Sequence, residues 1–242
     1  MKILAIETST EACSAALLTD ATEKKIVSRF ELVPREHTKL ILPMMDEVLD
    51  EAGVSLKELD AIAFGRGPGA FTGLRIASGI AQGIALSVEK PVVPVSTLHA
   101  LALQGHQLAQ KENLFSTRII TALDARMGEV YWGEFGVQNG LINLIGDEKV
   151  TQPTEMLTAT QLDSSNDLVV AIGTGWDAYQ QELFESKTPE NICFLQKKLP
   201  SAIAIAELAS LMLSEGKAVP PEEAQPVYIR NKIAKKSIKL NS

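Results

Sequence analysis

The sequence is poor in the residues that metal and disulfide chemistry require. Its 242 residues include two cysteines, Cys13 and Cys193, and three histidines. The cysteines lie far apart and form no C-x-x-C motif, which excludes a disulfide framework and a thiolate zinc site and indicates a reducing compartment. No histidine has a second one four residues away, the spacing by which one helix face holds a metal. The sequence therefore predicts no metal-ligating residue, and we expect a cytoplasmic protein.

Long apolar runs and basic residues are scarce as well. No stretch approaches the roughly 20 apolar residues of a membrane-spanning helix, so we expect no membrane association. Thirty acidic residues outnumber 23 basic ones, and five of the basic residues lie in the acid-free segment 227–242. The rest is an acidic body, which is unsuited to hold nucleic acid by itself. Because 45% of the residues are apolar, this body is expected to fold around a large core.

Apolar periodicity predicts alternating strands and helices in the first part of the chain. Two apolar runs separated by the polar residues 8–11 indicate a β-hairpin. Further on, a strand, a glycine-rich segment, a helix and a strand indicate a β-α-β crossover with parallel pairing. The predicted strands are 3–6, 12–18, 26–33, 59–64 and 92–95, and the predicted helices are 35–52, 73–88 and 96–109.

The second part of the chain repeats this opening. The apolar run 119–123 ends at Asp124, a four-residue loop follows, and an alternating strand returns over 129–135. Asp124 thereby takes the place that Glu7 has 117 residues earlier. Two strand–acid–loop–strand units, each opening a region of about 110 residues, predict a duplicated α/β fold. We place the first lobe at 1–108, the second at 109–226 and a basic tail at 227–242, with later strands at 168–172 and 192–195, a helix ending near 185 and a helix at 201–213.

The segment GRGPGAFTG (65–73) has four glycines in nine residues ahead of a predicted helix. It lacks the lysine of a Walker A loop, which excludes that motif. The helix N-terminus could hold an anion through its free N–H groups. Alternatively, the glycines could allow a sharp turn and a close approach of two backbones. We favour the packing interpretation.

Two acidic residues occupy places that suggest chemistry, since Glu7 and Asp124 each end a strand ahead of a polar loop. Facing each other across a cleft, the two hairpins could hold the phosphates and Mg²⁺ of a nucleotide, with Thr8 and Ser9 in the first loop. However, the first loop has no glycine and adds a further acid, and the second places the bulky Met127 there. The candidates for cofactor binding are thus Glu7, Thr8, Ser9 and Asp124. As a phosphate-binding site, however, the two loops look degraded. No catalytic residue is predicted, since the chain also lacks a G-x-S-x-G motif.

Six segments spread over essentially the whole chain carry a resemblance to a known family. They are LAIETSTEACSAAL, REHTKLILPMMDEVL, AFGRGPGAFTGLRIASGIAQGIAL, PVSTLHALA, LDARMGEVYW and PVYIRNKIAKK. Together they closely resemble the bacterial TsaB (YeaZ) family, a divergent branch of the actin-like ATPase superfamily. The resemblance implies an α/β protein with two tandem actin-like (ribonuclease H-like) lobes, each a mixed sheet flanked by helices.

The resemblance also implies a function in which this chain is not the catalyst. The related TsaD subunit is expected to hold the metal and to form N6-threonylcarbamoyladenosine in tRNA next to the anticodon. TsaB is then a non-catalytic partner that binds and stabilises TsaD, and the ATPase TsaE joins the assembly. No cofactor is required by this chain, ATP and metal belong to the partner subunits, and tRNA is contacted indirectly. Where TsaD is expected to hold a His-x-x-x-His pair, this chain has His37 and Ile41.

The same resemblance places the partner interface on two helices of the first lobe. The predicted interface residues are Leu40, Ile41, Met44, Met45, Val48, Ile76, Ile80, Gly83 and Ile84. A second copy of the chain could use the same surface, and these apolar faces could instead simply cover the sheet. Two further alternatives stay open: an actin-fold ATPase or phosphotransferase that uses Glu7 and Asp124, and a basic tail that contacts tRNA or is an ordinary solvated terminus.

Overall fold

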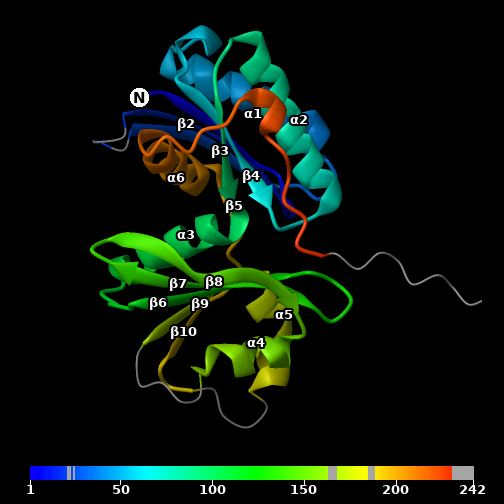
Figure 1. The fold of residues 1–242 in the computed structure, drawn as a ribbon, viewed down its shortest axis with the longest axis vertical. Coiled ribbons are helices and arrows are strands. Elements are labelled where there is room, and N and C mark those ends of the chain that lie inside the picture. Colours follow the sequence, from blue (N-terminus) through cyan, green and yellow to red (C-terminus); the bar gives the residue numbers. More distant parts are fainter. Residues whose placement is uncertain (21–22, 24, 163–167, 185–188, 231–242) are drawn as a thin grey trace, which may run out of the picture.

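The computed structural model describes residues 1–20, 23, 25–162, 168–184 and 189–230, and it contains two five-stranded sheets stacked one above the other (Figure 1). Each sheet combines three antiparallel strands with two parallel ones, and helices flank both sheets. The prediction of two tandem α/β lobes with mixed sheets is confirmed. None of the described helices is long and apolar enough to cross a bilayer.

The chain runs twice through the same series of elements, three strands followed by helix, strand, helix, strand and helix. The first series is β1 (Ile3–Glu7), β2 (Ala12–Asp20), β3 (Lys25–Leu32), α1 (His37–Ala52), β4 (Ala61–Gly67), α2 (Phe71–Ser87), β5 (Val92–Ser96) and α3 (Thr97–Lys111). The second is β6 (Arg118–Asp124), β7 (Val130–Gln138), β8 (Leu141–Thr151), α4 (Pro153–Thr160), β9 (Val169–Ile172), α5 (Thr174–Leu183), β10 (Ile192–Leu195) and α6 (Ala202–Ser214). This repetition confirms the predicted duplication.

The two sheets also share their strand order. The first is ordered β3-β2-β1-β4-β5 and the second β8-β7-β6-β9-β10. In each lobe the first strand is central, with Ile3 opposite Leu18 in the antiparallel hairpin and opposite Ala61 in the parallel pair. All five residues of β1 are buried, as expected for a strand that helices cover on both faces.

The last helix of each series packs on the other lobe's sheet. Helix α3 places Leu98 and Leu101 against the second sheet. In return, α6 places Ile205 and Leu208 against the first sheet, and Ser14 on β2 accepts a hydrogen bond of 3.0 Å from the first N–H of α6. The sequence division assigned α6 to the second lobe, whereas its contacts are with the first. Reciprocal exchange of helices buries apolar faces between the lobes and joins them.

Two elements, β8 and α4, were not anticipated from the sequence. Strand β8 lies at the edge of its sheet, and most of its side chains are exposed, so it shows little apolar alternation. Gly146 at φ +72° interrupts its pairing with β7. Helix α4 has eight residues, two turns, which is short for a periodic signal. The loop between β6 and β7 is also one residue longer than predicted, since β7 starts at Val130.

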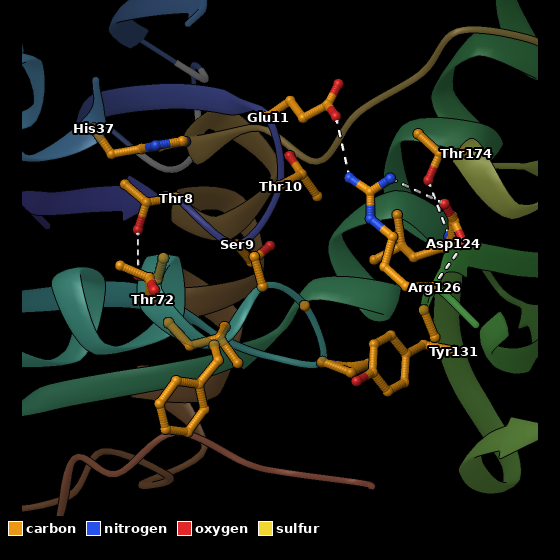
Figure 2. Close-up of a pocket in the computed structure, with 18 of the residues that line it drawn as sticks. Thr8, Ser9, Thr10, Glu11, His37, Thr72, Asp124, Arg126, Tyr131 and Thr174 are labelled. Carbon is orange, nitrogen blue, oxygen red and sulfur yellow. Dashed lines mark hydrogen bonds and ion pairs between the residues drawn. The ribbon is translucent and has the colours of Figure 1, made fainter. Parts of the chain in front are cut away.

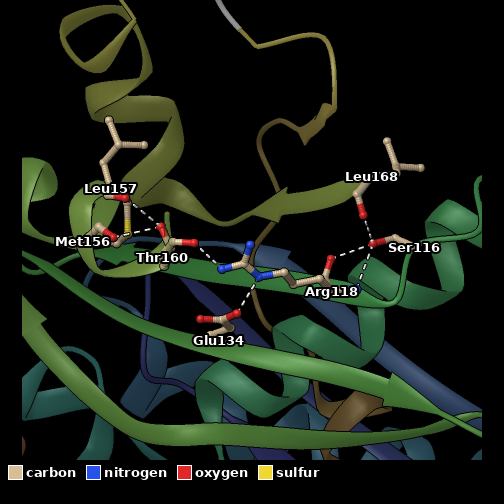
Figure 3. A network of polar contacts seen from close by, with 7 residues as sticks. All are labelled: Ser116, Arg118, Glu134, Met156, Leu157, Thr160 and Leu168. Carbon is tan, nitrogen blue, oxygen red and sulfur yellow. Dashed lines mark hydrogen bonds and ion pairs between the residues drawn. The ribbon is translucent and has the colours of Figure 1, made fainter. Parts of the chain in front are cut away.

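A polar network fastens α4 to the second sheet (Figure 3). Arg118 on β6 donates hydrogen bonds to the Glu134 carboxylate on β7 and to the carbonyl oxygen of Thr160 at the end of α4. The Ser116 hydroxyl lies 2.6 Å from the carbonyl oxygen of Leu168, just ahead of β9. The guanidinium thus satisfies a carbonyl at the helix C-terminus that no residue of the helix can reach.

Candidate functional site

The two lobes enclose a cavity of about 1270 Å³ (Figure 2). The first lobe contributes the β1–β2 loop, residues 8–11, and the start of α2, residues 71–74. The second lobe contributes residues 123–127 of the β6–β7 hairpin and Thr174 at the start of α5. The cavity therefore lies where the predicted hairpins meet, and its chemistry depends on which of their side chains face it.

Glu7 does not face the cavity, because its side chain is fully buried beneath β4. Its carboxylate accepts a hydrogen bond from the N–H of Ser9 and lies 3.5 Å from the hydroxyl of Thr97. A Cβ placed on Gly65 would come within 1.9 Å of the carboxylate, so the glycine makes room for the acid. Burial raises the pKa of Glu7, and the hydrogen bonds oppose that rise. Glu7 thus holds the hairpin in place rather than offering a ligand.

The glycine-rich segment lies directly on the β1–β2 loop. The Thr8 hydroxyl donates to the carbonyl oxygen of Gly73 (2.8 Å), and the N–H of Ala70 donates to the carbonyl oxygen of Ser9 (2.7 Å). A Cβ on Gly73 would meet the Thr8 carbonyl oxygen at 1.9 Å, and one on Gly69 would meet that of Ser9 at 2.5 Å. This close backbone contact confirms the packing interpretation of the segment. Thr8 and Ser9 are buried by it.

Asp124 lines the cavity, and the side chain of Arg126 lies beside it (Figure 2). Its carboxylate accepts a hydrogen bond of 2.8 Å from the N–H of Arg126, and the Arg126 guanidinium approaches it at 3.7 Å. The same guanidinium reaches Glu11 of the first lobe at 3.5 Å. The acid of the first hairpin that meets the second lobe is thus Glu11, whereas Glu7, a predicted candidate for cofactor binding, is buried. Sequence reasoning missed this role of Arg126.

These residues do not fit a magnesium-bound nucleotide. In the loop that would cradle phosphates, Thr8 and Ser9 are buried against the glycine-rich segment, and the Arg126 guanidinium lies between Glu11 and Asp124. Among the residues that the structure describes, no three His, Cys, Asp or Glu side chains gather closely enough to hold a metal. His37 is buried, and its Nε2 lies 3.2 Å from the carbonyl oxygen of Ala12.

The start of the predicted basic tail, residues 227–230, lines the cavity. The N–H of Val227 donates to the carbonyl oxygen of Arg66 on β4 (2.8 Å), and Tyr228 contacts Phe71 in a tilted ring pair with centroids 5.3 Å apart. Arg230 then forms an ion pair with Glu129 of the second lobe. Residues 227–230 therefore tie the lobes together, and the remainder of the tail, 231–242, lies outside the described residues.

The predicted interface residues divide into two groups. The members on the inner face of α1 are buried in the core of the first lobe, where they cover the sheet: Ile41, Met44, Met45 and Val48. The other members are half-buried or exposed: Leu40, Ile76, Ile80, Gly83 and Ile84. Packing within the chain therefore accounts for the first group.

An open face remains on α2. A Cβ on Gly79 or on Gly83 would meet nothing within 4 Å, and Leu86 one turn further is 59% exposed. With Ile76 at the preceding turn, these residues lie on one side of the helix, which we call the outer face of α2 (Ile76, Gly79, Gly83 and Leu86). On α1, Leu42 is about half exposed. Neither Leu42 nor Leu86 is among the predicted interface residues.

Comparisons with known proteins agree on one family. Residues 22–237 match the family model described as TsaD, tRNA N6-adenosine threonylcarbamoyltransferase. The tRNA threonylcarbamoyladenosine biosynthesis protein TsaB of Escherichia coli is 44% identical over 98% of both chains, and that of Haemophilus influenzae is 39% identical over 98% of this chain and 97% of the relative. The crystal structure of YeaZ from Pseudomonas aeruginosa is 40% identical, with a TM-score of 0.82 over 94% of this chain and 99% of that one.

Proposed function

The chain belongs to the family of the tRNA threonylcarbamoyladenosine biosynthesis protein TsaB, and we propose that it serves that pathway as a non-catalytic subunit that binds and stabilises TsaD. The proposed contact uses the outer face of α2 together with Leu42 on α1. The observation that carries the proposal is the pair of open glycines, Gly79 and Gly83, on a helix whose other face is fully packed.

Open glycines on a helix favour contact with another helix. Without side chains at these positions, a second backbone can approach closely, and helices pack by fitting ridges into such grooves. The flanking apolar side chains, Ile76, Ile80 and Leu86, would then be covered as well. Ile76 and Ile80 are half-buried against the core of the first lobe, and Leu86 is 59% exposed. An exposed apolar side chain next to open glycines is typical of an interaction site.

The cavity between the lobes supports the non-catalytic part of the proposal. An ATPase or phosphotransferase would need phosphate access to the β1–β2 loop, where the glycine-rich segment lies, and would need Glu7, which is buried. The ion pairs of Arg126 satisfy the acids that would otherwise attract a cation. The alternative of an actin-fold enzyme therefore has no specific support in the geometry.

The wider assembly follows from the same family relationship. We propose TsaE as a further partner, tRNA as a substrate reached through TsaD, and the cytoplasm as the place of action. We propose a second copy of the chain as a competitor for the outer face of α2, since an exposed helix face can pair with itself.

The experiment is co-purification of tagged TsaD with variants of the outer face of α2. Gly83→Glu and Gly79→Glu add side chains into open space, so the isolated chain should fold normally. In the complex, each would bury an unpaired carboxylate against a helix, which costs several kcal/mol, and we expect more than a tenfold loss of bound TsaD. Met44→Glu is unsuited to this purpose, because Met44 is 3% exposed and belongs to the core.

The matched control is Ala159→Glu, which places the same charge on an exposed position of α4 in the second lobe. It should retain TsaD as the wild type does. Folding of every variant is checked by its thermal unfolding curve. If both glycine variants fold and hold TsaD normally, the proposed contact is wrong.

A further inference from the structure

The last described residues of the chain pass from the first lobe to the second (Figure 1). At Val227 the chain still belongs to the first lobe, because its N–H donates to the carbonyl oxygen of Arg66 on β4 at 2.8 Å. Three residues later, the Arg230 guanidinium forms an ion pair with Glu129, just ahead of β7 in the second lobe. We call residues 227–230 the strap. They line the cavity, so they join the two lobes at its wall.

Charge holds the strap on the second lobe. The side chains of Arg230 and Glu129 are 24% and 18% exposed, and the Arg230 guanidinium lies 5.9 Å from the centre of the Tyr131 ring. Another ion pair across the cavity, between Arg126 and Glu11, joins side chains that are 76% and 60% exposed. Because partly buried charges are screened less than exposed ones, the strap is the firmer of these two links.

An exposed cluster holds the strap on the first lobe. The Tyr228 ring lies 5.3 Å from the Phe71 ring at the start of α2, measured between centroids. The Arg75 guanidinium lies 3.9 Å from the centre of the Phe71 ring, and its Nε donates to the Tyr228 hydroxyl at 3.2 Å. Arg75 is exposed and lies one turn before Gly79, on the same side of α2. The strap therefore contacts the helix beside the outer face of α2.

We propose that the strap couples the outer face of α2 to the closure of the two lobes. A helix that packs along Gly79 would also cover Arg75, and would thereby hold Tyr228 in place. With Tyr228 held, Arg230 stays on Glu129, and the lobes keep the separation that this structure shows. The inference rests on the proposed function, because TsaD is the partner expected on the outer face of α2.

The strap has few contacts, so its release does not require the lobes to unfold. Its four residues lie outside helices and strands. The lobes, in contrast, are joined by the buried faces of α3 and α6. Segments with few buried contacts open locally at a lower free energy than the whole domain. A fastened and a released strap are thus two states of the folded chain, and a partner that binds only the fastened state shifts the population toward it.

The first experiment follows the Val227 N–H by amide hydrogen exchange in the full chain, measured by nuclear magnetic resonance. Arg230→Glu and Glu129→Arg each place like charges against each other and release the strap. We expect the Val227 N–H to exchange about tenfold faster in either variant, with the amides of β1 unchanged. Combining the two substitutions reverses the ion pair and should restore the wild-type rate.

The matched control is Arg29→Glu, which reverses a charge that Glu47 and Glu51 hold within the first lobe. It should leave the exchange rate of the Val227 N–H unchanged. An unchanged rate in both single variants of the strap, or a combined variant that still exchanges fast, would overturn the proposal.

Closure of the lobes is measured as the distance between two spin labels, attached at Thr38→Cys and Met127→Cys. These positions line the cavity from opposite lobes. The labelled chain also carries Cys193→Ser, whereas Cys13 is fully buried and stays unlabelled. The distance should lengthen in either charge variant and return to the wild-type value in the combined variant. A distance that does not change would show that the strap does not set the closure.

The second experiment measures the affinity of the same variants for TsaD. Glu129 belongs to the second lobe and the outer face of α2 to the first, so a purely local contact predicts no effect of Glu129→Arg. Coupling between two sites is reciprocal, so Glu129→Arg and Arg230→Glu should each weaken TsaD binding about fivefold, with recovery in the combined variant. For the same reason, bound TsaD should slow the exchange of the Val227 N–H.

The two experiments separate this inference from the proposed function. Normal TsaD binding by both charge variants would overturn the coupling. A wild-type chain that does not bind TsaD would contradict the proposed function together with the coupling. The exchange rates of the Val227 N–H in the free chain would still decide whether the strap holds the lobes.

Discussion

The two hairpins that open the lobes have the same topology and opposite surroundings. In the β1–β2 hairpin, Thr8 and Ser9 are buried beneath the glycine-rich segment. In the β6–β7 hairpin, Met127 is 90% exposed, and a Cβ on Gly128 would meet nothing within 4 Å. The start of the first loop is thus buried, and the middle of the second loop is exposed.

The difference arises in the glycines that follow the fourth strand of each lobe. In the second lobe a Cβ on Gly173 would meet the carbonyl oxygen of Ala122, which lies within β6, at 2.3 Å. In the first lobe the corresponding contact falls on the β1–β2 loop, because a Cβ on Gly73 would meet the carbonyl oxygen of Thr8. The two lobes thus keep the same strands and helices while the glycines after the fourth strand contact the loop in one lobe and the strand before it in the other.

The largest effect is expected from filling the contact in the first hairpin. Gly73→Ala places a Cβ 1.9 Å from the carbonyl oxygen of Thr8, which is backbone and cannot rotate away. We expect the free energy of unfolding to fall by about 3 kcal/mol, as for severe overpacking. Urea denaturation followed by circular dichroism measures it.

Gly83→Ala is the matched control on the same helix. Its Cβ meets nothing within 4 Å, and alanine favours helix over glycine, so we expect stabilisation by about 0.5–1 kcal/mol. If both substitutions have equal effects, the glycine-rich segment does not cover the hairpin in solution.

Most of the fold could be predicted because burial produces periodic sequence. The run 3–6 is apolar without interruption, the run 119–123 is interrupted only by Thr121, and the structure finds both as central strands. Strand β8 escaped because it lies at an edge, where one buried residue, Ile142, leaves no pattern. The position of α6 escaped for another reason: an apolar helix shows that it is buried and does not show against which sheet.

The candidate site was less predictable than the fold. Glu7 could be found from its place after a strand, but a sequence does not show which way a side chain at a strand end points. The structure turns Glu7 inward and leaves Glu11 to meet Arg126. Likewise, the apolar stripe of α1 has the same spacing whether it covers a sheet or binds a partner, and the residues Ile41 and Met44 prove to cover the sheet.

A smaller, pH-dependent effect is expected from Glu7→Gln. Since burial raises the pKa of Glu7 above its ordinary value of 4.5, the folded chain binds the proton more tightly than the unfolded chain does. The stability from this group is fully present below pH 4.5 and is lost as the pH rises through the raised pKa. The substitution removes that loss, so the stability of the variant relative to the wild type should increase with pH.

Unfolding in urea between pH 4 and pH 8 measures this difference, and a tenfold change in proton affinity corresponds to about 1.4 kcal/mol. Glu148, whose pKa burial also raises, is present in both chains, so its contribution cancels in the comparison. A constant difference between variant and wild type across this range would show that the carboxyl group of Glu7 is not buried in solution.

The smallest effect is expected at the second hairpin. Arg126 is 76% exposed and Glu11 is 60% exposed, so a double-mutant cycle with Arg126→Ala and Glu11→Ala should give a coupling of about 0.2–1 kcal/mol that weakens in 0.5 M NaCl. The pair of Arg230 and Glu129, whose side chains are 24% and 18% exposed, serves as the reference and should couple more strongly. A coupling across Glu11 and Arg126 that matches the reference and resists salt would mean that the second loop is held as firmly as the first. The contrast between the hairpins would then lie in exposure alone, since both loops would be equally fixed.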